Sequence, residues 1–138
     1  MSQQDQRQKA LEEIRKIFEE GEAEINGRTY RFLKMQHVQR RRVYAYYSSI
    51  QRQLQLGDHS FLDSTGFAPV EEVMWNSITF DGALISKLRD HWEEVPEDYV
   101  TLIAAAMGVM SYPFLRAAGI ASASVEETQA KTTSSKPM

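Results

Sequence analysis

The chain has 138 residues, a formal net charge of −3 and no cysteine. This length suits one domain with a single core, and 42% hydrophobic with 25% charged residues is typical of a folded globular protein rather than a disordered or fibrous one. The absence of cysteine excludes disulfides, thiol nucleophiles and cysteine-ligated metal sites, and the polar start "MSQQDQRQKALEEIRK" does not resemble a signal peptide, so we expect a cytoplasmic protein.

An amphipathic helix is predicted over residues 3–20, with Gly21 where the helix would end. Its apolar side chains recur every three or four residues: Ala10, Leu11, Ile14, Ile17 and Phe18. The sequence therefore predicts a first helix with one apolar face.

A β-hairpin is predicted over residues 22–32. Asn26-Gly27 favours a two-residue turn, because both central residues of a type I′ turn need positive φ. Pairing across this turn sets Glu22 opposite Arg31 as an ion pair on one face. The apolar side chains on the other face are Ala23, Ile25, Tyr30 and Phe32.

Two further helices are predicted in the middle of the chain. The first covers about residues 36–55, with Gly57 as its terminator, and the second covers "PVEEVMWNSI" after a loop. The apolar stripe of the first is Val43, Tyr46, Tyr47, Ile50 and Leu54, and its polar shoulder is Arg40, Arg41 and Arg42. The inward side chains of the second are Val70, Val73, Met74 and Ile78. The sequence "TFDGALIS" leaves both a turn and a short extended segment open, and a short helix is expected over about residues 84–92.

The last strong element is a helix that begins at Pro96 and runs to about Ser111, because Pro113 removes a backbone donor. Its expected core residues are Leu102, Ala105, Ala106, Val109 and Met110. The apolar run is too short to cross a bilayer, which takes about 20 apolar residues. The fold class predicted is mainly α, with a domain over residues 1–116 and a flexible, disordered tail over residues 117–138, which is small and polar.

Charge is divided unevenly along the chain. Residues 28–52 carry seven basic and no acidic residues, whereas residues 58–98 carry ten acids against two bases. Ion pairing within the fold or between copies is favoured over nucleic-acid binding, because the chain as a whole is acidic. We therefore expect a homo-oligomer in which Arg40, Arg41 and Arg42 contribute to self-association, although basic residues beside Tyr44, Tyr46 and Tyr47 are also seen in proteins that bind single-stranded nucleic acid.

No catalytic or metal-binding motif emerges. The three histidines are scattered, and no nucleophile, phosphate-binding or dinucleotide motif occurs. The cluster Asp90, His91, Glu93 and Glu94 could supply an acid–base pair, but a charged, solvated helix end is the favoured interpretation. We expect a protein that is not an enzyme and has no cofactor.

The large apolar residues Tyr112, Phe114 and Leu115 stand at the expected end of the last helix. They either close the core or, with Trp92, form a docking patch for a partner, since exposed aromatic residues dominate binding energies at interfaces. The second interpretation follows from Pro113, which would stop the helix and let its neighbours project outward.

Two stretches carry a resemblance to a known family. The first is "INGRTYRF", which lies between an acidic helix and a basic one, and the second is "DHWEEVPEDYVTLIAAAMGVMSYPFL". Through these stretches, roughly residues 20–116 resemble the small tail-assembly chaperones of long-tailed bacteriophages. The resemblance implies a mainly helical, self-associating protein of the host cytoplasm that is absent from the finished tail. It would keep the phage tape-measure protein soluble while tail tube protein polymerises around it, with a frameshifted longer form in some copies. The alternative is a structural virion connector or tail-completion subunit.

Overall fold

The computed structural model describes the backbone of residues 3–135 and the side chains of residues 5, 6 and 8–118. It confirms the mainly α fold class, with a small antiparallel sheet. The α-helices are α1 (Gln3–Glu20), α2 (His37–Gln55), α3 (Phe67–Trp75), α4 (His91–Glu94) and α5 (Tyr99–Ser135). The strands are β1 (Glu22–Ile25), β2 (Arg28–Phe32), β3 (Ile78–Phe80) and β4 (Ala83–Leu84), and the 3₁₀ turns are η1 (Ser60–Asp63), η2 (Ile85–Lys87) and η3 (Pro96–Asp98).

The predicted first hairpin is confirmed in register as well as position. Asn26 and Gly27 have φ of 52° and 80°, as a type I′ turn requires. Strands β1 and β2 pair antiparallel with Glu22 opposite Arg31, and the Arg31 guanidinium lies 2.6 Å from Oε1 of Glu22. Ala23, Ile25 and Tyr30 are buried and Phe32 packs against the core, also as predicted.

A second hairpin occupies the segment that the sequence left open. Asp81 and Gly82 repeat the turn chemistry of the first hairpin, with φ of 51° and 82°, and join β3 to β4. Strand β3 then pairs antiparallel with β2, so that the sheet order is β1-β2-β3-β4. Ile78 is buried as expected, but it lies in β3, because α3 ends at Trp75.

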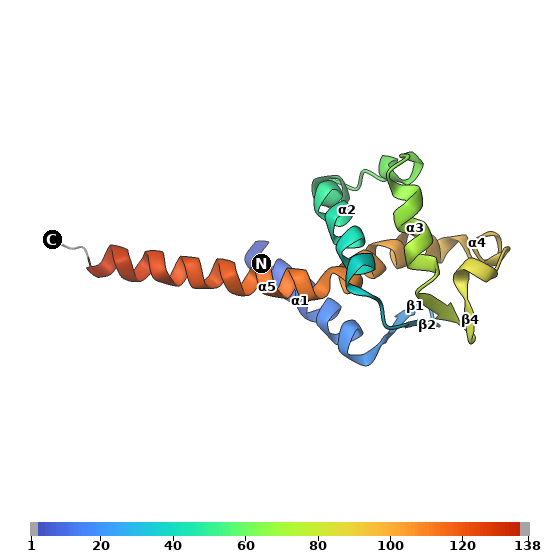
Figure 1. Cartoon of the computed structure of the whole chain (residues 1–138), viewed down its shortest axis with the longest axis horizontal. Helices are drawn as coiled ribbons and strands as arrows, with labels where there is room; N and C mark the ends of the chain where they lie inside the picture. Colours follow the sequence, from blue (N-terminus) through green and yellow to red (C-terminus); the bar gives the residue numbers. More distant parts are fainter. Residues whose placement is uncertain (1–2, 136–138) are drawn as a thin grey trace.

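The helices pack around α5. In Figure 1, α2 and α3 lie above the first half of α5, β1 and β2 lie below it, and α1 crosses α5 and ends below it. Helix α2 has the predicted bounds within one residue, and Gly57, with φ of 72°, follows its end. The approach of α1 to α5 is close at Gly108, where an added Cβ would lie 2.8 Å from Cδ1 of Ile14.

Helix α5 corrects the predicted end of the last element. It starts at Tyr99, after η3, and continues through Pro113 instead of stopping near Ser111. Proline inside a helix removes one backbone donor, but a helix packed on its neighbours tolerates that loss. Residues 117 and 118 are helical, and the expectation of a disordered tail otherwise falls beyond Ala118, outside the residues whose side chains are described.

The core includes most of the predicted apolar residues. Those that are buried are Val43, Ile50, Val70, Met74, Leu102, Ala106, Val109 and Met110, and α5 adds Ile103 and Met107. By length and composition the stretch Pro96–Ala118, with a mean hydropathy of 1.4, would also pass as a membrane span. Half of its apolar window is buried in the fold, and core helices meet the same criteria.

Candidate functional site

The predicted docking patch is partly inside the fold. Tyr112 is only 6% exposed, and its ring centroid lies 5.1 Å from that of Phe18. The expectation that Tyr112 projects outward is wrong, because α5 continues past Pro113 and keeps Tyr112 on the side that faces α1.

Phe114 and Leu115 are half-buried on two sides of α5. The ring of Phe114 stacks on Tyr44 of α2, with centroids 4.9 Å apart and planes inclined by 19°, and also contacts His37. Leu115 instead lines a groove beside α1. The two residues are therefore partly available to a partner, but they do not form one patch with Tyr112.

Trp92 belongs to a separate aromatic cluster at the start of α5. Its ring centroid lies 5.1 Å from those of Trp75 and Tyr99, and 4.6 Å from that of His91. Its indole Nε1 is buried without a partner among the described residues. Trp92 packs near the start of α5, whereas Tyr112 packs against Phe18 near the end of α1. Trp92 and Tyr112 therefore do not belong to one surface patch.

An apolar groove between α1, α2 and α5 is the main candidate binding surface. It has a volume of about 510 Å³. Its lining is Ala10, Leu11 and Ile14 of α1, Tyr47, Gln51 and Gln55 of α2, and Leu115 of α5. Apolar positions from three helices with glutamine amides among them suit an apolar helical segment of another chain. The apolar face predicted for residues 3–20 supplies one wall of the groove. The sequence did not predict that Leu115 would lie opposite this face, because that position requires α5 to continue through Pro113.

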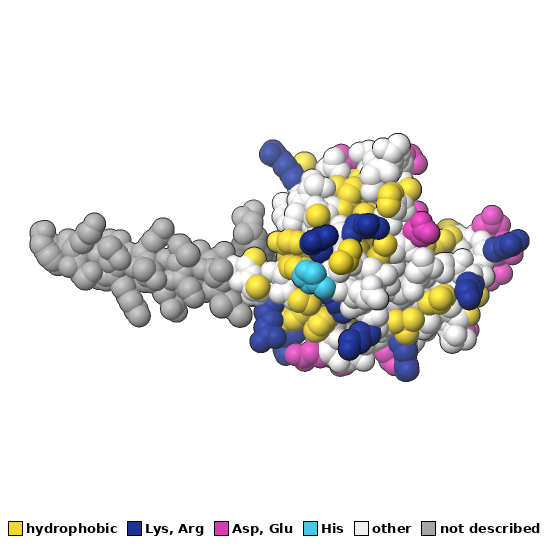
Figure 2. Space-filling view, in the orientation of Figure 1, with side chains coloured by type: hydrophobic (Ala, Val, Ile, Leu, Met, Phe, Trp, Pro, Cys, Tyr) yellow, Lys and Arg dark blue, Asp and Glu magenta, His cyan; other side chains and the backbone are white. Residues whose placement is uncertain are grey.

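Charges on the predicted self-association surface do not all face solvent. Arg41 and Arg42 are exposed, but Arg40 is half-buried and donates from Nη1 to the carbonyl oxygen of Met110 at 3.2 Å. The Arg40 guanidinium also lies 5.3 Å from the ring centroid of Phe18. Hydrophobic and basic side chains intermix on the face shown in Figure 2, while acidic side chains lie mainly toward its edges. Arg40 thus acts within the fold, which corrects its assignment to a surface.

A buried polar network joins the first hairpin to the start of α5. Asp98 is fully buried, and its carboxylate accepts from the Tyr30 hydroxyl at 2.6 Å, from Nδ2 of Asn26 at 2.7 Å and from Nη1 of Arg28 at 3.2 Å. Burial alone would raise the pKa of Asp98, but these donors outweigh it, so that the pKa lies below its ordinary value. No sequence pattern around Asp98 indicates these distant partners, so the sequence analysis missed its structural role.

His91 extends the network, and it is buried rather than part of a solvated helix end as predicted. Its Nε2 lies 2.9 Å from the hydroxyl oxygen of Tyr30. Tyr30 has one proton and gives it to Asp98, so Nε2 of His91 is the donor and neutral His91 keeps Nδ1 as its basic atom. Burial lowers the pKa of His91 despite the carboxylates of Asp98 and Glu94 nearby.

The network borders a second hollow of about 470 Å³, beside the second hairpin. Its charged lining mixes both signs: Asp81, Lys87, Arg89, Asp90 and Glu94, with His91 at its inner side. No group of His, Asp and Glu suitable for a metal ion occurs in the described part of the chain. The mixed charges do not single out one ligand.

Part of the opposite charge of the two segments is matched inside the molecule. Arg28, from the basic segment, contacts both Glu97 and Asp98 at 3.2 Å. Ion pairing within the fold, one of the alternatives left open by the sequence, therefore accounts for some of the charge segregation.

No protein-family model matches the sequence, and no curated protein or solved structure is detectably similar to it. The arrangement itself defines a small, mainly helical protein with an antiparallel meander. The groove beside Leu115 is lined by side chains of three of its helices, α1, α2 and α5.

Proposed function

We propose that the chain is a non-enzymatic tail-assembly chaperone of a long-tailed bacteriophage, which binds the tape-measure protein in the host cytoplasm and supports assembly of the tail tube. The observation that carries the proposal is the apolar groove between α1, α2 and α5. The resemblance of residues 20–116 to this family supports it from the sequence side.

The occupant of the groove is an amphipathic helix of the tape-measure protein. Such a helix presents apolar side chains at positions i, i+3, i+4 and i+7, which enter a groove between helices. Leu11, Ile14 and Leu115 offer contacts for these side chains. The side-chain amides of Gln51 and Gln55 can donate to and accept from polar residues at the edge of the client helix. Because these amides are neutral, the client residues need not be charged.

Co-expression with segments of the tape-measure protein tests the proposal. Leu11→Glu places a charge in the groove, and we expect it to weaken capture of the client by about tenfold or more while the protein stays folded. Leu56→Glu is the matched control, because Leu56 is 74% exposed and lies outside the groove. Equal capture by both variants would contradict the proposed surface.

The fate of the protein during assembly separates the two phage functions. A chaperone is lost when tails are completed, whereas a connector or tail-completion subunit is retained. Detection of the chain in purified, finished particles at a fixed stoichiometry would overturn the chaperone proposal and favour the structural alternative.

Self-association is proposed to depend on the exposed charges that the fold leaves available, which include Arg41 and Arg42. Raising the salt concentration from about 50 to 500 mM shortens the Debye length to about 4 Å, and we expect the oligomer mass to fall. Arg41→Glu with Arg42→Glu should have the same effect at low salt. An unchanged mass in both experiments would exclude electrostatic assembly.

A further inference from the structure

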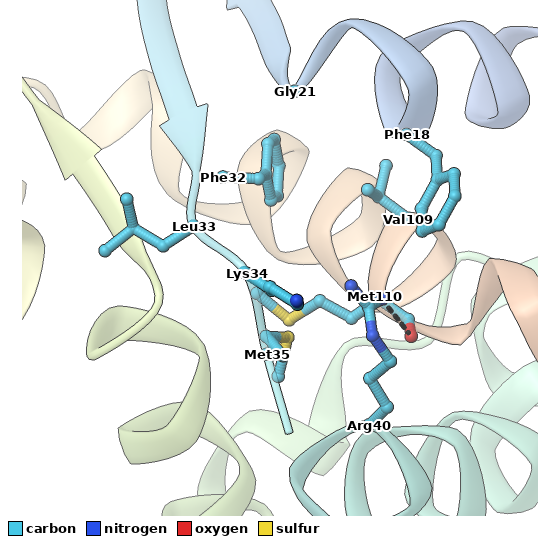
Figure 3. Close-up of a pocket in the computed structure, with 9 residues that line it drawn as sticks. All are labelled: Phe18, Gly21, Phe32, Leu33, Lys34, Met35, Arg40, Val109 and Met110. Atoms are coloured by element: carbon cyan, nitrogen blue, oxygen red, sulfur yellow. Dashed lines mark hydrogen bonds between the residues drawn. The ribbon is translucent and has the colours of Figure 1, made fainter. Parts of the chain in front are cut away.

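A small hollow lies where the end of β2, the start of α2 and the middle of α5 meet the end of α1. Figure 3 shows the side chains around it. Its volume is about 150 Å³, and its apolar wall includes Phe18, Phe32, Met35 and Val109. A cavity of this size holds a group about as large as benzene. The hollow is thus large enough for one leucine-sized or phenyl side chain.

Two cationic side chains, Arg40 and Lys34, border the hollow. Arg40 is half-buried and uses one of its five N–H groups for the carbonyl oxygen of Met110. Within the described residues, no carboxylate pairs with Arg40 or Lys34. Arg28, which is also half-buried, differs because Glu97 and Asp98 lie beside it. Burial, without an acid to oppose it, lowers the pKa of Arg40. An unpaired guanidinium in this position favours an anion beside it.

The backbone adds a third donor. The N–H of Phe32 donates to the carbonyl oxygen of Gly21 at 2.8 Å, whereas that of Leu33 points the other way and donates to Ser77. Lys34 lies two residues beyond the end of β2, and continued alternation of the backbone would direct its N–H to the same side as that of Phe32. This N–H has no hydrogen bond among the described residues, and both Gly21 and Lys34 line the hollow.

We propose that this hollow binds the C-terminal carboxylate of a peptide chain whose last residue is apolar. The carboxylate accepts from the remaining N–H groups of Arg40, from the Lys34 ammonium and from the Lys34 backbone N–H. The last side chain enters the apolar hollow between Phe18 and Phe32. This site is separate from the groove beside Leu115, and it holds or fails independently of the proposed function.

A titration of the full chain with short peptides tests the proposal, read by ¹H–¹⁵N chemical shifts. The probes are acetyl-Gly-Gly-Leu with a free carboxylate, the same peptide as its C-terminal amide, and 4-methylpentanoate. We expect shifts at the residues that line the hollow, and an affinity for the free acid about tenfold or more above that of the amide. Equal affinity of acid and amide overturns the proposal. Binding of 4-methylpentanoate as tight as that of the peptide also overturns it, because a free small acid would then suffice.

Charge variants locate the site. Lys34→Gln, on an exposed side chain, should weaken the free-acid peptide by about threefold, and Arg40→Gln should weaken it further. Arg52→Gln is the matched control, since Arg52 is exposed on the same helix and does not line the hollow. A loss with Arg52→Gln equal to that with Lys34→Gln overturns the site in favour of general charge attraction. Because Arg40 also supports α5, Lys34→Gln decides the test if Arg40→Gln unfolds.

Discussion

The hydroxyl of Tyr30 donates to Oδ2 of Asp98 across 2.6 Å, and it thereby fastens the centre of the sheet to the turn that precedes α5. Both side chains are fully buried. This bond connects two segments far apart in the sequence, the "INGRTYRF" hairpin and the "DHWEEVPEDYV" approach to the last helix.

Asp98→Ala should lower the free energy of unfolding by about 3 kcal/mol, because it leaves the donors of Tyr30, Asn26 and Arg28 without their shared acceptor. Urea unfolding measures the change. Glu97→Ala is the matched control: Glu97 also contacts Arg28, but it is 53% exposed, and we expect a cost below about 1 kcal/mol. Similar losses for the two variants would argue against the network as the stabilising unit.

Stability should fall on mild acidification because of His91. Its pKa in the folded protein lies below the ordinary value of 6.5, so the unfolded chain takes up a proton first as the pH falls. The contribution of neutral His91 is fully present above pH 6.5 and is lost between that value and the lower folded pKa. Asp98, whose folded pKa is also lowered, adds a second loss below its ordinary value of 3.8.

Thermal melts between pH 8 and 5 measure the effect of His91. The variant His91→Gln should be less stable at pH 8, and its melting temperature should change less with pH over this interval. His59→Gln, at an exposed histidine, is the control that should keep the profile of the parent protein. A parent profile that is flat from pH 8 to 5 would contradict the assignment.

Gly108→Ala should destabilise the protein by about 1–2 kcal/mol, because the new Cβ meets Ile14 across the contact of α1 with α5. The penalty should depend on the δ-methyl group of Ile14. In an Ile14→Val background, Gly108→Ala should become neutral or stabilising, since alanine has a higher helix propensity than glycine by about 1 kcal/mol. Additive effects in this double-mutant cycle would show that the helices do not meet at Gly108.

Pro113→Ala should raise the free energy of unfolding by about 1–3 kcal/mol, because an alanine N–H can donate to the carbonyl oxygen of Val109 four residues earlier. Pro113 is exposed, so the change removes little packing. Chemical denaturation measures the gain. A loss of stability would contradict this expectation and would mean that the proline ring supports the neighbouring contacts of Tyr112 and Phe114.

The sequence predicted the elements whose cause is local. The hairpin register follows from Asn26-Gly27 and from alternation along the strands, and α2 follows from its apolar stripe and from Gly57. Asp81-Gly82 carries the same turn chemistry as the first hairpin, yet strands of three and two residues are too short for a pattern of alternation. Strands β2 and β3 are separated in the sequence by α2 and α3, so no local pattern reveals that they pair.

The candidate site was harder to predict for the same reason. Asp98 looks like a favourable acid at a helix start, and its hydrogen-bond partners lie 68 to 72 residues away in the sequence. Tyr112 was expected outside because Pro113 is a strong local signal for a helix end. Tertiary packing overrides that signal, as the Arg40 bond to Met110 illustrates. The sequence placed Arg40 on the polar shoulder of its helix, and no pattern along the chain indicated the hollow beside it.

The separation of β2 from β3 by α2 and α3 has a consequence for how the protein folds. Each hairpin closes around a two-residue turn, on a timescale of about 1–10 μs, but the sheet is complete only after the chain between residues 32 and 78 has closed into a loop. Loop closure costs entropy before the β2–β3 contacts compensate for it. Substitutions that weaken this pair, such as Thr79→Gly, should therefore slow folding more than equally destabilising changes within the turn at Asn26. Because two helices separate β2 from β3 in the sequence, we expect pairing of the two hairpins to be the slow step in folding.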